Sequence, residues 1–333
     1  MNINAQNKND NDMETLNLTQ EWDKTFPKSD KVNHQKVTFD NRYGITLAAD
    51  LYIPKDAKAP LPAIVVAGPY GAVKEQASGL YAQHLAERGF LTIAFDPSFT
   101  GESGGQPRYV SSPDINTEDY SGAVDYLMTR DDVDHDKIGI VGICGWAGIS
   151  ISAALQDTRI KATVASTMGA FDDFDRQQRI ATRKQLNDQR TVDAREKKHT
   201  LAGGLPEERP AGPAFFSDYW DYYKTQRGYH PRSLNSNGGW QTITLLPWLN
   251  FNLFDHADEI EAPVLVIHGE KAYSLPASIH AFERMTAVTS NTSRTSGNKE
   301  LMVIPGASHT DLYDQLDIIP FDKIESFFKE NLK

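Results

Sequence analysis

Short apolar segments that alternate with helix-like stretches constrain the fold of this chain more than any other feature. They are residues 63–67 (AIVVA), 91–95 (LTIAF), 137–142 (KIGIVG) and, much later, 264–268 (VLVIH). A strand without a polar side is buried on both faces, as in a parallel sheet covered by helices. Strands and helices that alternate imply right-handed crossovers. The sequence therefore predicts an α/β fold with a mostly parallel central sheet.

A different strand pattern precedes these segments. Residues 35–39 and 44–53 alternate apolar with polar side chains, and the stretch between them, 40–43 (DNRY), has turn-forming residues. Alternation with a period of two on both sides of a turn predicts an antiparallel hairpin at one end of the sheet.

The strand–helix alternation is interrupted once. Residues 170–255 are rich in charged and aromatic side chains and show no strand pattern, whereas strand and helix patterns return at 264–268, 301–304 and about 321–332. We therefore expect a core formed by 31–169 and 256–333. A mainly helical insert, 170–255, would cover the strand ends as a cap. Residues 1–30 are polar, and we expect them to be mobile.

Composition narrows the function classes. The chain has 34 Lys and Arg against 45 Asp and Glu, a net charge of −11, which disfavours nucleic acid as a partner. Cys144 is the single cysteine, so an intrachain disulfide and a multi-thiolate zinc site are excluded. The N-terminal stretch lacks signal-peptide features, and no apolar run approaches the ~20 residues of a membrane helix. We expect a cytoplasmic protein with a small-molecule substrate, no metal and no organic cofactor; a homodimer is left open.

The strongest chemical motif surrounds Cys144. The strand 137–142 runs into Gly142-Ile143-Cys144-Gly145-Trp146-Ala147-Gly148 and then into a helix. Small residues around a nucleophile allow the sharp strand-to-helix turn that exposes the reactive atom. The N-terminus of the following helix favours a thiolate. A lone buried cysteine that only packs is the structural alternative.

A second motif competes with the first. Residues 101–105 (GESGG) match Gly-x-Ser-x-Gly with Ser103 as the nucleophile. Pro107 follows closely and prevents a helix from starting at the serine. We therefore expect a loop near the active site rather than a nucleophile at Ser103.

The other site residues are expected at strand ends. His309 follows the last strand, 301–304, where a general base can reach a nucleophile. Glu270 is the carboxylate in the turn after 264–268, and Asp172 or Asp173 are the alternatives for the acid. The order nucleophile, acid, histidine is that of α/β-hydrolases. An oxyanion hole would use the backbone N–H groups of Tyr70 and Gly145.

The chain resembles the α/β-hydrolase superfamily, and within it the dienelactone-hydrolase-related branch with a cysteine nucleophile. The matching stretches are GPYGAVKEQ (68–76), FDPSFTGESGGQPR (95–108), GICGWAG (142–148), HGEKAYS (268–274) and PGASHTDLYD (305–314). The chain departs from that pattern at Trp146, where a small residue is usual, and at Ala272, where the aspartate usually stands. The stretch Gly68-Pro69-Tyr70 lacks the glutamate of dienelactone hydrolase, so that substrate is not carried over.

These features predict a hydrolase of a carboxylic ester, lactone or thioester that works through a Cys144–His309–Glu270 triad and an acyl-enzyme. Trp146, Trp220 and Trp248 would line a largely apolar substrate pocket. Two alternatives stay open. One is an acyltransferase that moves a polyketide-type acyl group through the same acyl-enzyme. The other is an inactive hydrolase fold that serves as a binding protein.

Overall fold

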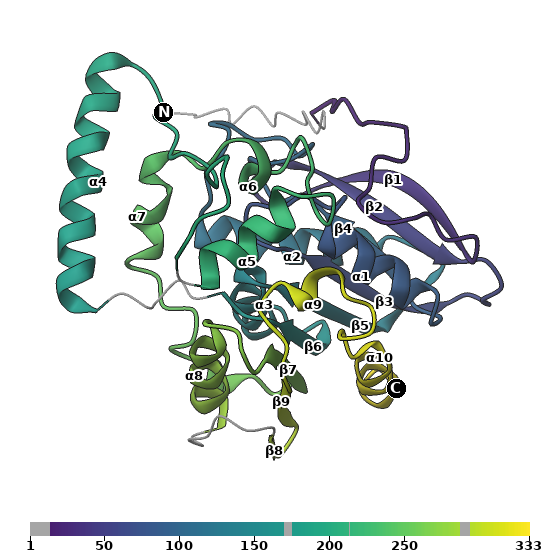
Figure 1. The fold of residues 1–333 in the computed structure, drawn as a ribbon. Helices are drawn as coiled ribbons and strands as arrows, with labels where there is room; N and C mark the ends of the chain where they lie inside the picture. Colours follow the sequence, from purple (N-terminus) through teal and green to yellow (C-terminus); the bar gives the residue numbers. More distant parts are fainter. Residues whose placement is uncertain (1–13, 170–174, 213, 287–293) are drawn as a thin grey trace, which may run out of the picture.

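The computed structural model describes residues 14–169, 175–212, 214–286 and 294–333, and a twisted sheet crosses its centre (Figure 1). Nine strands lie in the order β1-β2-β4-β3-β5-β6-β7-β9-β8. Pairing is antiparallel for β1–β2, β2–β4 and β8–β9, and parallel for all the others. The strands are β1 (Val32–Asp40), β2 (Thr46–Pro54), β3 (Leu61–Ala67), β4 (Leu91–Phe95), β5 (Val133–Ile143), β6 (Ile160–Ser166), β7 (Val264–Gly269), β8 (Arg294–Ser296) and β9 (Lys299–Ile304).

The predicted α/β-hydrolase fold, with its mostly parallel sheet, is confirmed, and the apolar segments explain why the sheet forms. In β3, Ala63 and Val65 pack into the core on one face, whereas Ile64 and Val66 pack on the other. The predicted hairpin is β1 and β2, with Val37 opposite Ala49. It forms one end of the sheet.

Helices cover both faces of the sheet. The helices α1 (Ala77–Ala86) and α10 (Phe321–Asn331) contribute to one core cluster. The other cluster takes residues from α2 (Pro113–Met128), α3 (Gly145–Gln156) and α8 (Leu275–Thr286). Among the described residues, no helix is both long and apolar enough to cross a membrane.

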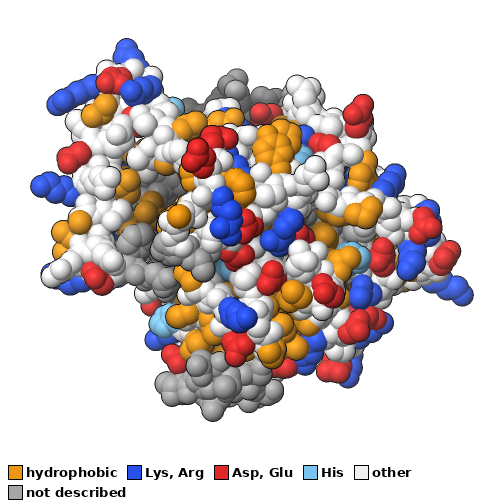
Figure 2. Space-filling model, in the orientation of Figure 1, with side chains coloured by type: hydrophobic (Ala, Val, Ile, Leu, Met, Phe, Trp, Pro, Cys, Tyr) orange, Lys and Arg blue, Asp and Glu red, His pale blue; other side chains and the backbone are white. Residues whose placement is uncertain are grey.

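The described part of the segment between β6 and β7 consists of helices and loops, as its composition predicts, with one isolated antiparallel bridge between Leu201 and Gln241. It contains α4 (Arg176–Glu196), α5 (Ala214–Tyr223), α6 (Leu234–Asn237) and α7 (Leu245–Trp248), with the short 3₁₀ turns Thr242–Thr244 and Ala257–Glu259. The helix α4 stands at the edge of the molecule (Figure 1), and only Leu186 and Asp193 of it are buried. On the face of the molecule that Figure 2 shows, basic and acidic side chains intermingle. We call the described part of 175–255 the cap.

The N-terminal expectation needs a correction for residues 14–30, which pack against the core. Phe26 is buried beside α1, and the Lys24 ammonium lies 2.7 Å from the Asp50 carboxylate with both side chains inaccessible to solvent. The backbone N–H of Thr19 donates to Glu102. Charged residues made the segment look unstructured, but their partners are buried charges of opposite sign.

A cluster of buried charges holds the loop that follows β3. The Lys74 ammonium contacts the carboxylates of Glu75, Asp96 and Glu102 at 2.6–2.8 Å, and its side chain has no solvent exposure. Burial opposes the charge on Lys74, but the surrounding carboxylates outweigh burial and hold its pKa well above the usual value. Arg232 of the cap reaches Glu75 at 2.9 Å. The cluster therefore ties core and cap together.

Replacing Lys74 by methionine should destabilise the fold strongly, because the buried carboxylate of Asp96 would lose its cation. Glu75 and Glu102 would keep only their ion pairs with Lys36 and Arg232. Removal of one partner of a buried ion pair costs about 3–5 kcal/mol. We expect a loss of that size in the free energy of unfolding measured in urea. The control is Lys329→Met, which removes the exposed partner of Glu325 on α10 and should change the free energy by less than about 0.5 kcal/mol. Equal effects of the two substitutions would contradict this role of Lys74.

Candidate active site

Cys144 lies at the sharp turn between β5 and α3. Its backbone has φ 59° and ψ −125°, a conformation that L-residues rarely adopt. A side chain at Gly142 would collide with the backbone of Trp146, so only glycine fits two residues before the cysteine. The Cys144 N–H donates to the carbonyl of Ser166 on β6 at 3.0 Å. The predicted strand–turn–helix is present, and it fixes where the thiol points.

The thiol reaches His309 through a tyrosine. Cys144 Sγ lies 3.2 Å from the hydroxyl of Tyr219, and that hydroxyl lies 3.0 Å from His309 Nε2. Tyr219 comes from α5 of the cap, and its ring stacks on the imidazole with centroids 5.3 Å apart. The structure thus brings Cys144 and His309 into one site and adds Tyr219 between them.

His309 is buried and its other nitrogen faces a serine. Nδ1 lies 2.5 Å from Ser274 Oγ, which lies 3.0 Å from His268 Nε2. Burial, together with nearby His268, lowers the pKa of His309 well below its usual value, so the ring is neutral at pH 7. The loop is pinned by Thr167, whose hydroxyl donates to the His309 carbonyl at 3.0 Å.

The expectation that Glu270 orients His309 is wrong in this structure. Glu270 is exposed, and its carboxylate accepts the backbone N–H of Gly306 at 2.8 Å. Glu270 comes directly after β7, so its side chain turns toward the neighbouring β9 loop and away from the site. The residue of this turn that reaches His309 is Ser274, which comes four residues after Glu270. The alternatives Asp172 and Asp173 lie outside the described residues.

Ser103 has a structural role, as the proline after it predicts. Its hydroxyl donates to the carbonyl of Asp96 at 2.6 Å and accepts the N–H of Ala48 at 2.8 Å. The side chain is buried, and the loop joins β2 to the end of β4. No part of this geometry exposes Ser103 as a nucleophile.

The expected oxyanion residues, Tyr70 and Gly145, both line the pocket that contains Cys144. The cap holds the Tyr70 loop, because Asn235 Nδ2 donates to the Tyr70 carbonyl at 2.8 Å. Gly169 keeps the space above the thiol open. A Cβ at that position would lie 3.2 Å from both Cys144 Sγ and the nitrogen of Gly145.

The pocket over Cys144 has a volume of about 370 Å³. Its described walls are mainly apolar, and the cap contributes Gly203, Leu205 and Trp240. The ring of Trp240 stacks on Tyr70 with centroids 4.3 Å apart. Pockets of this size hold small organic molecules.

None of the three tryptophans predicted for the substrate pocket lines the cavity over Cys144. Trp146 is buried in the core on one face of the sheet, where its ring packs against Phe95 and Tyr120. Trp220 points away from the pocket and donates to the carbonyl of Pro206.

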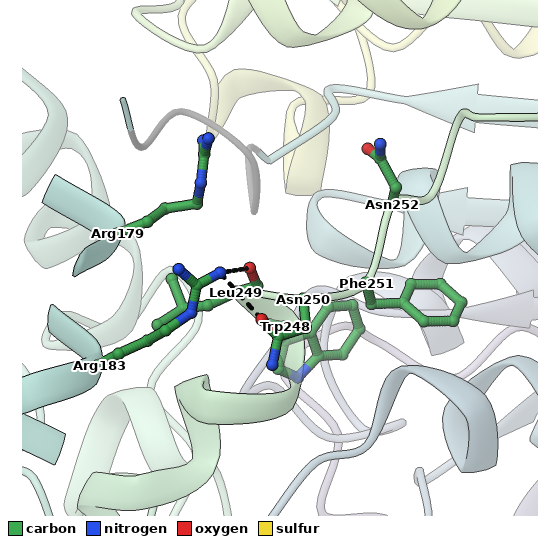
Figure 3. A pocket seen from close by; sticks show the side chains of 7 residues that line it. All are labelled: Arg179, Arg183, Trp248, Leu249, Asn250, Phe251 and Asn252. Carbon is green, nitrogen blue, oxygen red and sulfur yellow. Dashed lines mark hydrogen bonds between the residues drawn. The ribbon is translucent and has the colours of Figure 1, made fainter. Parts of the chain in front are cut away.

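Trp248 lines a separate cavity of about 360 Å³ beside α4 (Figure 3). There Arg183 donates to the carbonyl of Leu249 and to the side chain of Asn250. The ring of Trp248 also lies edge-to-face with Tyr70, which lines the pocket over Cys144, with centroids 6.1 Å apart.

Sequence reasoning missed Ser274, His268, Tyr219 and Trp240 as parts of the site. One signal was available: His268 ends an otherwise apolar strand, where an ionisable side chain is rare unless it has a partner. The other three lie in loops or in the cap, where their positions depend on tertiary contacts.

Comparisons with known proteins support the α/β-hydrolase fold and show the family. Residues 43–311 match the family described as X-Pro dipeptidyl-peptidase (S15 family). The chain belongs to the X-Pro dipeptidyl-peptidase (S15) family. The narrower likeness to dienelactone hydrolases stays a prediction.

Two uncharacterized relatives cover most of this chain, and a third matches less than half of it. The uncharacterized protein PA2218 of Pseudomonas aeruginosa is 52% identical over 328 residues, 95% of this chain and 86% of that protein. Its crystal structure superposes with a TM-score of 0.89 and covers 96% of this chain and 99% of that one. The uncharacterized protein YcjY of Escherichia coli K12 is 33% identical over 317 residues, 90% of this chain and 99% of that protein. The acyltransferase drtE of Aspergillus calidoustus is 32% identical over 142 residues, 43% of this chain and 45% of that protein.

For this S15-family chain, Ser274→Ala should slow alkylation of Cys144, whereas Glu270→Gln should not. Without Ser274, His309 loses the partner of Nδ1 and takes the thiol proton less well. We expect the rate of carbamidomethylation by iodoacetamide at pH 7, followed by mass spectrometry, to fall about tenfold in Ser274→Ala. Glu270→Gln should stay within twofold of the parent protein. The reverse ranking would return the orienting role to Glu270.

Proposed function

We propose that the protein hydrolyses an ester, lactone or thioester through an acyl-enzyme on Cys144. One observation carries the proposal: Cys144 Sγ is connected by the Tyr219 hydroxyl to His309 Nε2 at the floor of a mainly apolar pocket. Nucleophile and base within hydrogen-bond reach, with the base oriented by a third group, is the arrangement of nucleophilic catalysis. Here the third group is Ser274.

Acylation needs one proton to move along this connection. The Cys144 thiol gives its proton to the Tyr219 oxygen while the Tyr219 proton passes to His309 Nε2, and Sγ bonds to the carbonyl carbon. The N–H groups of Gly145 and Tyr70 would bind the oxyanion. When the intermediate collapses, the bond to the leaving group breaks and that group takes the proton back from His309. Water then attacks the acyl-enzyme, returns a proton by the same path and releases the acid.

The buried histidine favours esters and thioesters over peptides. An amine leaving group must be protonated as it departs, which requires a stable imidazolium. His309 has a lowered pKa and a neutral serine at Nδ1, so its imidazolium gains little stabilisation. Thiolates and phenolates leave without strong assistance. The family's name describes a peptidase, and this site argues for the activated acyl compounds instead.

Acyl transfer is the second candidate, and the likeness to the acyltransferase drtE favours it. Transfer and hydrolysis share the acyl-enzyme and differ in whether an alcohol, amine or water attacks it. A pocket with mainly apolar walls would retain the acyl group while another acceptor enters. Product analysis with added alcohols would separate the two outcomes.

A p-nitrophenyl ester tests the proposal directly. We expect a burst of one chromophore per active site and an acyl adduct on Cys144 by mass spectrometry. Cys144→Ala should abolish both, and Ser103→Ala should keep both. Tyr219→Phe should slow the burst by about 10²-fold, the usual share of a proton-transfer group, and still yield the Cys144 adduct. An adduct on Ser103 would refute the mechanism, and the absence of any adduct would indicate a binding protein.

The pocket wall should set acyl-chain preference through Trp240 and not through Trp220. Trp240→Ala would enlarge the cavity and should shift the kcat/KM ratio of decanoyl to butanoyl p-nitrophenyl esters about tenfold toward the longer chain. Trp220→Ala, outside the pocket, should leave the ratio within twofold. The same shift in both variants would mean that the cap acts through its overall stability.

A further inference from the structure

Three side chains continue inward from His309 in a line of hydrogen bonds. His309 Nδ1 lies 2.5 Å from Ser274 Oγ, and Ser274 Oγ lies 3.0 Å from His268 Nε2. His268 Nδ1 lies 2.6 Å from Ser278 Oγ on α8. All four side chains are at most 1% exposed. Within the described part of the chain, neither imidazole has a hydrogen bond to a carboxylate.

The hydroxyl of Ser274 carries a single proton, which forces a choice. It can donate to His309 Nδ1 or to His268 Nε2, but not to both. If it donates to His309, the ring proton of His309 must sit on Nε2, and that nitrogen cannot accept a proton. If it donates to His268, it accepts from His309 Nδ1–H, and Nε2 is free to act as a base.

The surroundings of His268 allow the second arrangement; because the Ser278 hydroxyl can donate as well as accept, the outer side of His309 supplies the further argument. Burial lowers the pKa of His268 to about 3, so the ring is neutral and carries one proton. Its Nδ1 faces Ser278, which can accept that proton at 2.6 Å. With the proton on Nδ1, His268 Nε2 is an acceptor and takes the proton of Ser274. The line of bonds then runs in one direction from His309 to Ser278.

The outer side of His309 agrees with this direction. Two phenols, Tyr219 and Tyr313, lie 3.0 Å from Nε2. Burial raises the pKa of both phenols, so each keeps its proton. The Tyr313 hydroxyl donates to the Tyr219 oxygen at 3.4 Å, which leaves the Tyr219 proton for Nε2. A hydroxyl group that donates to Nε2 requires that this nitrogen carries a lone pair and no proton.

We propose that His268 is a positioning residue that, through Ser274, holds the ring proton of His309 on Nδ1 and leaves Nε2 as the base. This inference rests on the proposed function, since it assigns the tautomer of the histidine that acts as the base in acyl transfer. A neutral serine–histidine pair thereby does the orienting work that a carboxylate does in an ordinary triad. It orients the ring without supplying a negative charge.

His268→Leu and His268→Gln form the test. Glutamine can accept the Ser274 proton near the position of Nε2, whereas leucine cannot. We expect His268→Leu to lower kcat for the p-nitrophenyl ester about tenfold with KM within twofold, since loss of the carboxylate in a serine protease triad costs ~10⁴-fold and Ser274 remains here. His268→Gln should recover most of the rate.

Nitrogen-15 NMR of the histidine rings supplies the readout that packing alone would not change. In the parent protein and in His268→Gln, His309 should carry its proton on Nδ1, whereas His268→Leu should give a mixture of tautomers. If His268→Leu does not fold, Ser278→Ala should produce the same mixture by removing the acceptor of His268. A protonated His309 Nε2 in the parent protein, or unchanged tautomers in the variants, would overturn the proposal. Failure of Cys144 to become acylated would instead refute the proposed function.

Discussion

The turn at Cys144 is the constraint on which the site depends. A cysteine at φ 59° is strained by an amount of order 1–3 kcal/mol, and the surrounding sheet must hold it there. The bond from Cys144 N–H to Ser166 on β6 and the glycine at position 142 do so from two sides. Because the turn starts α3 directly beneath the thiol, Sγ points out of the sheet, and the cap can only reach it from above. Tyr219 of the cap contacts the thiol, which the proposed function makes the nucleophile.

Within the described residues, Nδ1 of His309 meets a serine and no carboxylate, and under the proposed function this shapes the chemistry more than the identity of the nucleophile does. In an ordinary triad the acid stabilises the imidazolium as well as orienting the ring. At this site Ser274 and His268 can orient the ring, but they leave it neutral and buried. A thiol is the nucleophile suited to such a base, since it loses its proton more readily than a hydroxyl does. The cysteine and the neutral relay are therefore consistent with each other.

Most of the fold could be predicted from the sequence, because the composition of an apolar segment such as 91–95 is enough to predict that it is buried. The Gly-x-Cys-Gly turn and the position of His309 after the last strand likewise depend on local sequence, and the structure brings the two residues together. The prediction for Glu270 was wrong because it assumed that a carboxylate in the turn after β7 would point into the site. The direction of a side chain at a strand end depends on the neighbouring strands. The prediction for the three tryptophans was wrong for a similar reason. Aromatic residues in the cap predict that it packs on the core, but their presence does not tell which ring faces the cavity.

The cap and the loop after β3 behave as one structural unit, which has consequences for how substrate recognition meets catalysis. The hydroxyl of Ser233 donates to the Gly71 carbonyl at 2.9 Å, and Asn235 binds the Tyr70 carbonyl from the same short helix. Farther inside, Arg232 joins Glu75 in the buried charge cluster around Lys74. Residues 232–235 of the cap thus hold the same loop that would supply one N–H to the oxyanion, while Trp240 a few residues later forms the pocket wall. Under the proposed function, the fit of the acyl group and the binding of the oxyanion therefore depend on the same contacts, because the ring of Trp240 also stacks on Tyr70.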